Sequence, residues 1–380
     1  MLQSRIKPLD SIRTFAVLLV IVSHWLHFSY IKVFDLGAVG VNIFFVLSGF
    51  LITRILLESK KEAETKKINK LLIIKNFIIR RSLRIFPIYY LTIIILLIFN
   101  AKSETFIKQD FEYYATYSSN ILFFLKQGWD GKLSHLWSLA VEEQFYLIWP
   151  WLIIFIKQKY LKHIIIFFLF FGVLSNYILA SIFPHHKLLN ILTPSCFDAF
   201  CSGAILSYLM VFKADFVPAF TKWLSYLAPV CLILFVLSSL FNFDTIIPHR
   251  TLISVFALYL IAFTIQFQGS ILHTVLLNNK RLIFLGKISY GIYLYHNFIP
   301  WIWQVSVKKL DELNMHIPLV NAYMPVKFSG ILILTERFAL LVLISWLSWI
   351  LIESPINKLK DKFNYKFPVR RKSHREILAA

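Results

Sequence analysis

An arginine and a histidine stand in an apolar stretch near the start of the chain, which reads LDSIRTFAVLLVIVSHW from Leu9 to Trp25. An ionisable side chain at bilayer depth is costly and commonly marks a pathway or a functional site. Arg13 and His24 are eleven residues apart. In a helix they share one face, about 16 Å apart along the axis. Asp10 lies on the same face, which we expect to point into the protein.

Other polar residues of the apolar stretches fall at two depths when depth is estimated from the helical rise per residue. Near the cytoplasmic side, with Asp10 and Arg13, lie Arg54, Arg80, Arg81, Arg84 and Glu353. In the outer half, with His24, lie Glu142, Glu143, Tyr293, His296, Glu336 and Arg337. Arginines bind phosphate oxygens and stay charged. A histidine with a carboxylate partner can take a proton from a hydroxyl near neutral pH. The two layers predict transfer of a group from a cytoplasmic phosphorylated donor to an acceptor reached from outside.

The composition is that of an integral membrane protein. Of the 380 residues, 58% are hydrophobic and 16% charged, and the mean hydropathy is +0.67. A water-soluble domain of this size does not show such values. The net charge of +20 could suit nucleic acid, but the basic residues lie between apolar stretches and form no separable domain. We therefore expect no nucleic acid and take membrane lipid head groups or a phosphorylated ligand as the anionic partner. The three cysteines show no metal-ligand spacing, so no metal site is expected.

The apolar stretches predict an all-α, polytopic membrane fold. A span needs about 20 mostly apolar residues. Ten stretches meet this rule, at residues 12–28, 39–57, 85–100, 136–156, 163–183, 195–212, 223–240, 251–267, 283–307 and 331–352. Residues 118–125 are too few to cross and are expected to be re-entrant or interfacial.

The distribution of basic residues predicts the orientation. With the N-terminus in the cytoplasm, 26 Lys and Arg fall in inside segments and 10 in outside segments. The positive-inside rule then places both termini in the cytoplasm. We expect one transmembrane domain over residues 1–355 and a basic cytoplasmic tail over residues 356–380.

Six segments, in order, resemble the signatures of the acyltransferase 3 family of membrane O-acyltransferases. That family includes bacterial enzymes that O-acetylate lipopolysaccharide, peptidoglycan and other exported glycans. The segments are LDSIRTFAVLLVIVSHW (9–25), GVNIFFVLSGFLIT (40–53), RRSLRIFPIYY (80–90), HLWSLAVEEQFYLIWP (135–150), GKISYGIYLYH (286–296) and WILIESP (349–355).

The resemblance implies roles for particular residues. Arg13 and His24 fall on the proposed catalytic pair, and Arg81 and Arg84 on residues implicated with the acyl-CoA donor. Acids of the motifs fall on Glu142, a candidate to orient His24 or to pack helices, and on Glu353. We expect Asp10 and Glu353 on the donor side, and Tyr293 and His296 at the acceptor end. Ser48 is expected to serve helix packing, because its helical setting is not that of a nucleophile elbow.

Two departures from the family pattern stand out. Ser11 replaces a glycine that usually follows the acid, and its small size changes little. Many relatives carry a C-terminal SGNH-type domain, whereas here the chain ends soon after the last predicted span. Transfer is therefore expected to finish in the membrane domain or with a separate partner.

Together these features predict a multi-pass acyltransferase of the inner (cytoplasmic) membrane. It would move an acyl group, expected to be acetyl, from acetyl-CoA to a hydroxyl of an exported glycan such as lipopolysaccharide O-antigen, or of a lipid-linked sugar. No tightly bound cofactor is expected. The residues leave open a longer acyl chain and a transient acyl-enzyme. The alternative is a transporter or flippase of an anionic lipid-linked or sugar precursor, for which buried charges are also normal.

Overall fold

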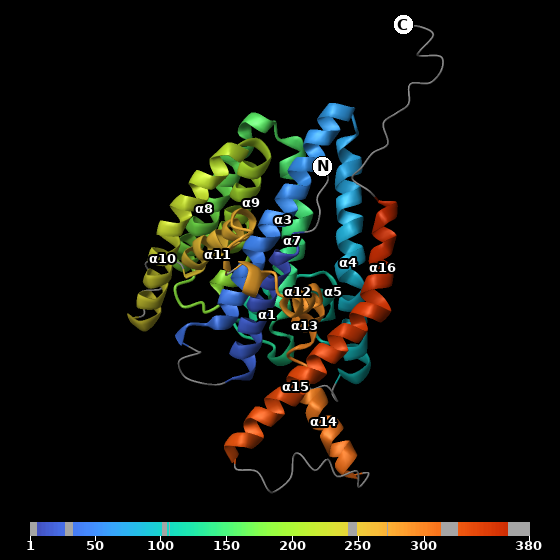
Figure 1. Ribbon diagram of the computed structural model, residues 1–380. Coiled ribbons are helices and arrows are strands. Elements are labelled where there is room, and N and C mark those ends of the chain that lie inside the picture. The colour runs from blue at the N-terminus through green and yellow to red at the C-terminus, as the bar shows by residue number, and fades with distance from the viewer. Residues whose placement is uncertain are drawn as a thin grey trace, which may run out of the picture.

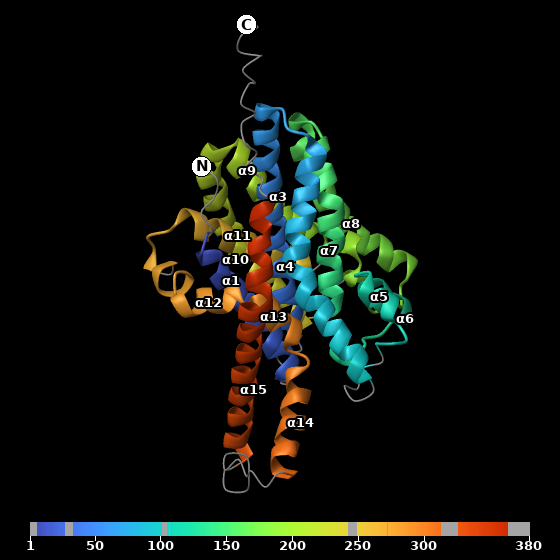
Figure 2. The ribbon, with the colours of Figure 1, turned by 90° about the vertical axis from the view of Figure 1, so that its right-hand side faces the viewer.

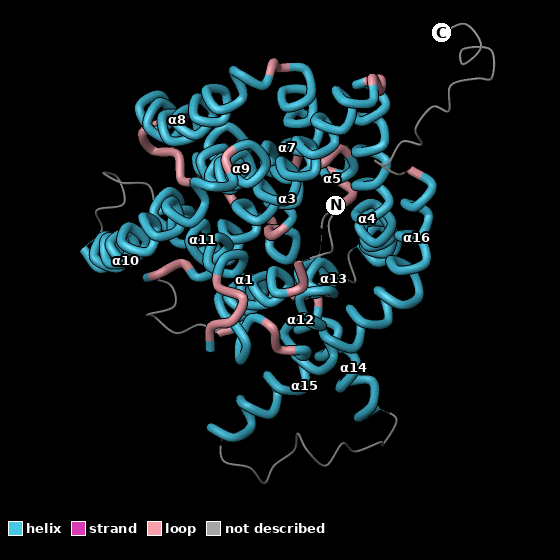
Figure 3. Tube along the Cα trace, turned by 45° about the horizontal axis from the view of Figure 1, so that its top comes forward, coloured by secondary structure: helices cyan, strands magenta, loops and turns pink. Residues whose placement is uncertain are grey.

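The computed structural model describes residues 6–26, 33–100, 105, 107–241, 249–271, 273–312 and 326–363. Within these ranges every regular element is a helix, and Figure 3 shows helices joined by short loops. The predicted all-α fold is confirmed.

Eight helices among the described residues are long and apolar enough to cross a membrane. The polytopic membrane fold is therefore confirmed, with eight candidate spans against the ten predicted. The eight are α1 (Pro8–Trp25), α3 (Leu36–Lys66), α4 (Lys70–Phe99), α8 (Gln158–Ile182), α9 (Phe197–Phe212), α10 (Val217–Phe241), α11 (His249–Gln266) and α15 (Val326–Ser348). Short turns precede two of them, η4 (Thr193–Cys196) before α9 and η5 (Ala214–Phe216) before α10. Helix α15 is continued by η7 (Trp349–Glu353), α16 (Ser354–Lys358) and η8 (Leu359–Lys362).

The other two predicted spans take different forms. Residues 136–156 form α7 (Leu136–Phe155), a helix whose carboxylates Glu142 and Glu143 lower its hydropathy. Residues 283–307 break into α12 (Lys280–Lys287), α13 (Ser289–Tyr295) and α14 (Ile299–Glu312). Pro300 stands at the start of α14, where a proline is tolerated because the first helical N–H groups have no partner in the helix. The breaks could not be predicted, because the stretch is mostly apolar on both sides of each of them.

The stretch predicted to be too short to cross is the eight-residue helix α6 (Ser119–Lys126). It follows α5 (Phe111–Ala115) and packs against α7. Figure 2 shows α5 and α6 at the side of the helix bundle, near α7 and α8. Three short turns complete the described elements, namely η2 (Gly131–Leu133), η3 (Leu189–Ile191) and η6 (His273–Leu277).

Helix α3 forms the centre of the bundle and packs against α1, α7, α9 and α11 (Figure 1). Its crossing with α9 is closed by two glycines. A Cβ on Gly49 would lie 1.9 Å from the Phe200 carbonyl oxygen, and a Cβ on Gly203 would lie 2.0 Å from the Val46 carbonyl oxygen. Small residues let helix backbones approach in this way in membrane proteins. The pair fixes α3, which carries residues of both cavities described below.

The two ends of the molecule differ in the helices that form them. In Figures 1 and 2 the turn between α3 and α4 and the end of α16 lie toward the top, and α14 and α15 project at the bottom. At the top, Arg80 Nη1 donates to the carbonyl oxygens of Lys360 (2.8 Å) and Phe363 (3.1 Å). Residues 356–363 of the predicted tail therefore pack against α4, and residues 364–380 lie outside the described residues.

Candidate active site

Two cavities lie along α1, one toward each end of this helix. The inner cavity has a volume of about 80 Å³ and is lined by Arg13, Ser48, Arg81, Arg84, Glu142, Tyr146 and Tyr290, among others. The outer cavity has a volume of about 800 Å³ and is lined by His24, Asp35, Trp129, Lys132, His135, Trp137 and Asn297, among others. The structure thus assigns Arg13 and His24, on one helix, to two different cavities.

A single layer of side chains separates the cavities, because Val41, Phe45 and Tyr293 line both. Tyr293 is held firmly: its hydroxyl hydrogen-bonds Ser138 Oγ and donates to the His135 carbonyl oxygen at 3.1 Å. The Phe45 ring packs on Phe200, with ring centroids 4.8 Å apart. These contacts hold two sides of the layer in place.

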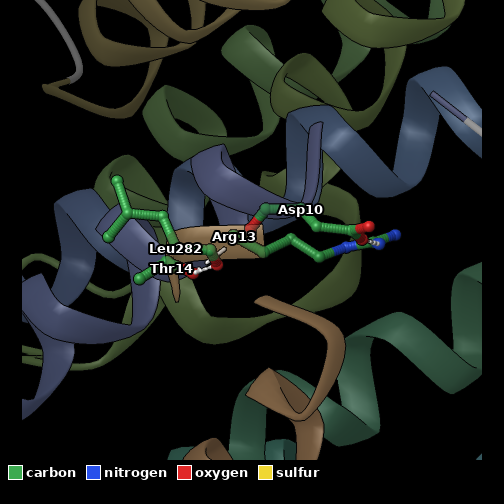
Figure 4. A network of polar contacts seen from close by, with 4 residues as sticks. All are labelled: Asp10, Arg13, Thr14 and Leu282. Atoms are coloured by element: carbon green, nitrogen blue, oxygen red, sulfur yellow. Dashed lines mark hydrogen bonds and ion pairs between the residues drawn. The ribbon is translucent and has the colours of Figure 1, made fainter. Parts of the chain in front are cut away.

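At the inner cavity, Arg13 pairs with the acid three residues before it. Arg13 Nη1 lies 2.7 Å from Asp10 Oδ1, and the Asp10 side chain is 2% exposed. Figure 4 shows the two side chains running in the same direction and meeting at their ends, while Thr14 points to Leu282. Thr14 Oγ1 donates to the Leu282 carbonyl oxygen at 2.6 Å, which ties α1 to α12. Asp10 is therefore placed to orient Arg13.

Two further arginines come from α4. The Arg81 guanidinium lies over the Tyr146 ring, 5.5 Å from its centroid, and over the Phe77 ring at 5.7 Å. Such contacts hold a guanidinium while leaving its charge available. Arg84 lines the same cavity and lies within electrostatic reach of both Arg13 and Arg81. Of the five arginines that the sequence places in the inner layer, the structure brings three together here. The other two lie elsewhere: Arg54 pairs with Glu58, and Arg80 bonds the backbone of residues 360 and 363.

Glu142 lies with these arginines and not beside His24. Its Oε1 accepts a hydrogen bond from Ser48 Oγ at 2.6 Å, and the Tyr146 hydroxyl donates to Ser48 Oγ at 3.1 Å. All three arginines act on its carboxylate electrostatically. The placement of Glu142 in the outer half, as a partner of His24, is therefore not what the structure shows. Ser48 does more than pack helices, because it bonds this buried carboxylate.

At the outer cavity, His24 is exposed and His296 lies directly behind it. His24 Nδ1 is 2.8 Å from His296 Nε2, and the rings stack with centroids 5.0 Å apart. His296 is fully buried, and its Nδ1 lies 2.6 Å from the Tyr293 carbonyl oxygen. Trp25 Nε1 also donates to the His296 carbonyl oxygen, at 3.1 Å. His296 is not among the residues that line the outer cavity. It contacts His24, and the expectation that it lines the acceptor end is not met.

Sequence reasoning missed His135, the first residue of the fourth motif. Its Nε2 lies 3.0 Å from the Leu294 carbonyl oxygen, and its Nδ1 lies 3.1 Å from both Asn297 Nδ2 and the Lys132 carbonyl oxygen. Its ring centroid lies 4.9 Å from that of His296. His135 precedes α7, and burial lowers its pKa to about 3. Its position just before the apolar stretch could have marked it as a candidate site residue. It has no acidic neighbour in the sequence that would suggest a catalytic role.

Other predicted residues lie away from the two cavities. Glu353 is 2% exposed, accepts from Ser348 Oγ at 3.4 Å and lies within electrostatic reach of Arg84. Glu336 accepts from Trp303 Nε1 at 3.1 Å, between α14 and α15. Glu143 faces a third cavity of about 260 Å³, lined in part by Arg81. Among the described residues no group of His, Cys, Asp and Glu could hold a metal ion.

Comparison with known proteins gives the family. The family described as an acyltransferase domain (acyltransferase 3) matches residues 6–353. The chain belongs to this family, as its motifs predict. This membership favours the acyltransferase interpretation over that of a transporter or flippase. No solved structure matches the chain.

Several curated relatives carry names that describe O-acetyl transfer. The peptidoglycan O-acetyltransferase OatA of Listeria monocytogenes is 30% identical over 375 residues, which cover 93% of this chain and 56% of that protein. A putative O-acetyltransferase of Staphylococcus aureus is 31% identical over 77% of this chain and 50% of that protein. The putative peptidoglycan O-acetyltransferase YrhL of Bacillus subtilis is 40% identical over 38% of this chain and 23% of that protein. The chain thus spans about half the length of the first two relatives.

Proposed function

We propose that this chain transfers an acetyl group from acetyl-CoA to a hydroxyl of a cell-surface glycan, with peptidoglycan as the acceptor. The names of the Listeria and Bacillus relatives support peptidoglycan. They do not mention lipopolysaccharide O-antigen, the example that the sequence suggested. The observation that carries the proposal is the pair of cavities on α1, one with three arginines and one with His24, separated by one layer of side chains.

The inner cavity is proposed as the place of the donor's reactive end. Its volume of about 80 Å³ is far below the roughly 300–1,000 Å³ of sites that hold whole small molecules. It can take a small acyl thioester and not an entire coenzyme, which favours acetyl over a long chain. Arg13, Arg81 and Arg84 supply positive charge for the thioester carbonyl oxygen. Asp10 and Glu353 act on this site through Arg13 and Arg84.

The outer cavity is proposed as the place of the acceptor. Its volume of about 800 Å³ can hold a sugar unit of a glycan chain. Trp129 and Trp137 offer aromatic faces to the sugar, and Lys132 and Asn297 offer hydrogen-bond donors. Tyr293 belongs to both cavities and lies where the reacting groups would meet.

The reaction needs a base at the acceptor hydroxyl, and His24 is the candidate. The ring takes the hydroxyl proton as the oxygen attacks the acetyl carbonyl carbon, and the carbon–sulfur bond breaks. The coenzyme A thiolate leaves and takes up a proton, so the new ester and free coenzyme A balance the reaction. The electrostatic role of Arg13, Arg81 and Arg84 is to stabilise the charge that develops on the carbonyl oxygen.

For this transfer the inner cavity must be open to the cytoplasm. The excess of basic residues in the segments assigned to the inside supports that orientation, in the cytoplasmic membrane, with both termini inside. A topology reporter fused after Ala380 is expected to score as cytoplasmic. A reporter that scores as extracytoplasmic contradicts it.

The acceptor is tested in cells that carry or lack the gene. Mass spectrometry of purified peptidoglycan is expected to show ester-linked acetate that is lost without the gene and restored by wild type but not by His24→Gln. His186→Asn is the control, because His186 also bonds a backbone carbonyl, that of Phe124 at 2.8 Å, but lines neither cavity. Unchanged peptidoglycan acetate, with loss of acetate from another surface glycan, would rule out peptidoglycan as the acceptor.

A further inference from the structure

The hydrogen bonds of His296 define where its proton lies. A backbone carbonyl oxygen can only accept, so His296 Nδ1, 2.6 Å from the Tyr293 carbonyl oxygen, must carry a hydrogen. His296 is 0% exposed, and the ionisable rings that face it are the imidazoles of His24 and His135 and the phenol of Tyr293. A buried imidazolium without a carboxylate partner is strongly unfavourable. The His296 ring is therefore neutral, and its Nε2 carries a lone pair.

That lone pair determines the tautomer of His24. His24 Nδ1 lies 2.8 Å from His296 Nε2, so it must donate to it. A neutral imidazole has only one N–H group. The second ring nitrogen of His24, Nε2, is then left with its lone pair, on a ring that is exposed in the outer cavity.

We propose that His296 is a positioning residue that fixes His24 in the Nδ1–H tautomer, through a hydrogen-bond chain anchored on the Tyr293 backbone carbonyl, so that His24 Nε2 is the base. The proposal rests on the proposed function of His24. It assigns to a neutral histidine the orienting role that a carboxylate commonly has beside a catalytic histidine.

The acids nearest to the site are already committed elsewhere. Glu142 accepts from Ser48 Oγ in the inner cavity. Asp35 lines the outer cavity and acts electrostatically on His24, but the hydrogen bond that its Oδ1 accepts comes from the Ala38 backbone N–H at 3.2 Å, so it caps α3. His135 contributes packing, because its ring meets that of His296 at an interplanar angle of 70°. These contacts hold the His296 ring in the plane that serves His24.

Two substitutions of His296 separate hydrogen bonding from packing. Glutamine can place an amide oxygen where His296 Nε2 lies and accept from His24, whereas leucine fills space without accepting. We expect His296→Leu to lower kcat about 10- to 100-fold, the usual effect of losing an orienting partner, with the KM of either substrate little changed. His296→Gln is expected to keep most of the wild-type kcat, and His186→Asn is the control. Equal losses in the two His296 variants at wild-type abundance, or a wild-type kcat in the leucine variant, overturn the proposal.

A spectroscopic readout tests the tautomer without any activity. The full chain, with ¹⁵N-labelled histidine, is placed in lipid nanodiscs, and the ring nitrogens are observed by NMR. The signals of His24 are assigned by their absence in His24→Gln. We expect the Nδ1–H tautomer in wild type and in His296→Gln, and the Nε2–H tautomer, the more stable one in water, in His296→Leu.

The two hypotheses fail in different ways in this experiment. A wild-type His24 in the Nε2–H form overturns the role of His296, whatever the activity of the protein. The Nδ1–H form in wild type and in His296→Gln, with its loss in His296→Leu, supports that role. If His24→Gln nevertheless transfers acetyl groups normally, the proposed function of His24 is wrong while the tautomer assignment stands.

Discussion

The inner and outer cavities differ about tenfold in volume, roughly 80 against 800 Å³, although they share a wall. The inner cavity is lined by guanidinium groups and one carboxylate. The outer cavity is lined by histidines, tryptophans and amides, together with the charged side chains of Asp35, Lys132 and Arg250. One helix, α1, supplies Arg13 to the first and His24 to the second. Under the proposed function, we expect the small cavity to select the donor by charge and size, and the large one to select the acceptor by shape and by hydrogen bonds.

This difference separates two kinds of kinetic effect. Changes at the inner cavity should act on the donor, and changes at the outer cavity on the acceptor or on proton transfer. A substitution that acts equally on both would show that the two cavities are one site. The predictions below test this separation, beginning with the largest expected effect.

His24→Gln should lower kcat by about 10² to 10⁴ while the affinity for acetyl-CoA stays at its wild-type value. Glutamine keeps a hydrogen-bonding group but cannot take up the proton. Purified protein in nanodiscs, assayed with radiolabelled acetyl-CoA and soluble peptidoglycan fragments, gives both quantities. If the affinity for acetyl-CoA falls as well, the two cavities act as one functional site. Near-normal transfer at wild-type abundance would show that the histidine holds the fold.

Arg81→Ala should have the opposite signature, with weaker donor binding and a smaller change in acceptor KM. A hydrogen bond to a charged group contributes about 1.5 to 3 kcal/mol, so the donor affinity should fall by roughly 10- to 150-fold. The matched control is Arg54→Ala, because Arg54 lies on α3, pairs with Glu58 at 3.1 Å and lines neither cavity. Equal losses in the two variants would indicate a general effect of membrane-surface charge.

The separation into two layers was largely predictable from sequence. Helical rise placed Arg13, Arg81 and Arg84 at one depth and His24, Tyr293 and His296 at another, and the structure groups them in this way. The depth estimate works for Arg13, His24, Arg81 and Arg84 because α1 and α4 are continuous helices over these residues. Tyr293 and His296 come from α13 and its C-cap, in the stretch that is broken. The order of the motifs predicted the family.

Glu142 shows where the estimate of depth from helical rise fails. It lies six residues after the start of α7, about 9 Å along the helix and short of the middle of a core of about 30 Å, so depth alone assigns it to the outer half. Its partner, Ser48, comes from α3, and a pairing between helices cannot be read from one sequence. The breaks between α12, α13 and α14 were missed because apolar composition does not mark a turn. His135 was missed because no acidic residue beside it in the sequence suggests chemistry.

Gly203→Ala should destabilise the framework between the cavities and affect both equally. The new Cβ would lie 2.0 Å from the Val46 carbonyl oxygen and 2.5 Å from the Phe50 backbone nitrogen, neither of which can move alone. Overpacking of this kind costs about 1 to 3 kcal/mol. Thermal unfolding followed by size-exclusion chromatography should show a lower midpoint. Gly128→Ala is the control, because its nearest neighbour would be 3.7 Å away. A wild-type midpoint for Gly203→Ala would contradict the close crossing of α3 and α9.

Trp129→Ala is expected to have the smallest effect, confined to the acceptor. The Trp129 side chain is 51% exposed at the outer cavity, with its ring centroid 6.5 Å from that of Trp137. Loss of an aromatic face costs about 0.5 to 1.5 kcal/mol, so the KM for peptidoglycan fragments should rise roughly 2- to 12-fold. The KM for acetyl-CoA should not change.

The control for this prediction is Trp223→Ala on α10, a tryptophan that is 57% exposed and lines neither cavity. The two variants remove the same side chain from positions of similar exposure, so a difference between them reports the cavity and not the loss of apolar surface. A higher KM for acetyl-CoA in Trp129→Ala would mean that the donor reaches past Val41, Phe45 and Tyr293. In that case the donor and the acceptor would share the larger space.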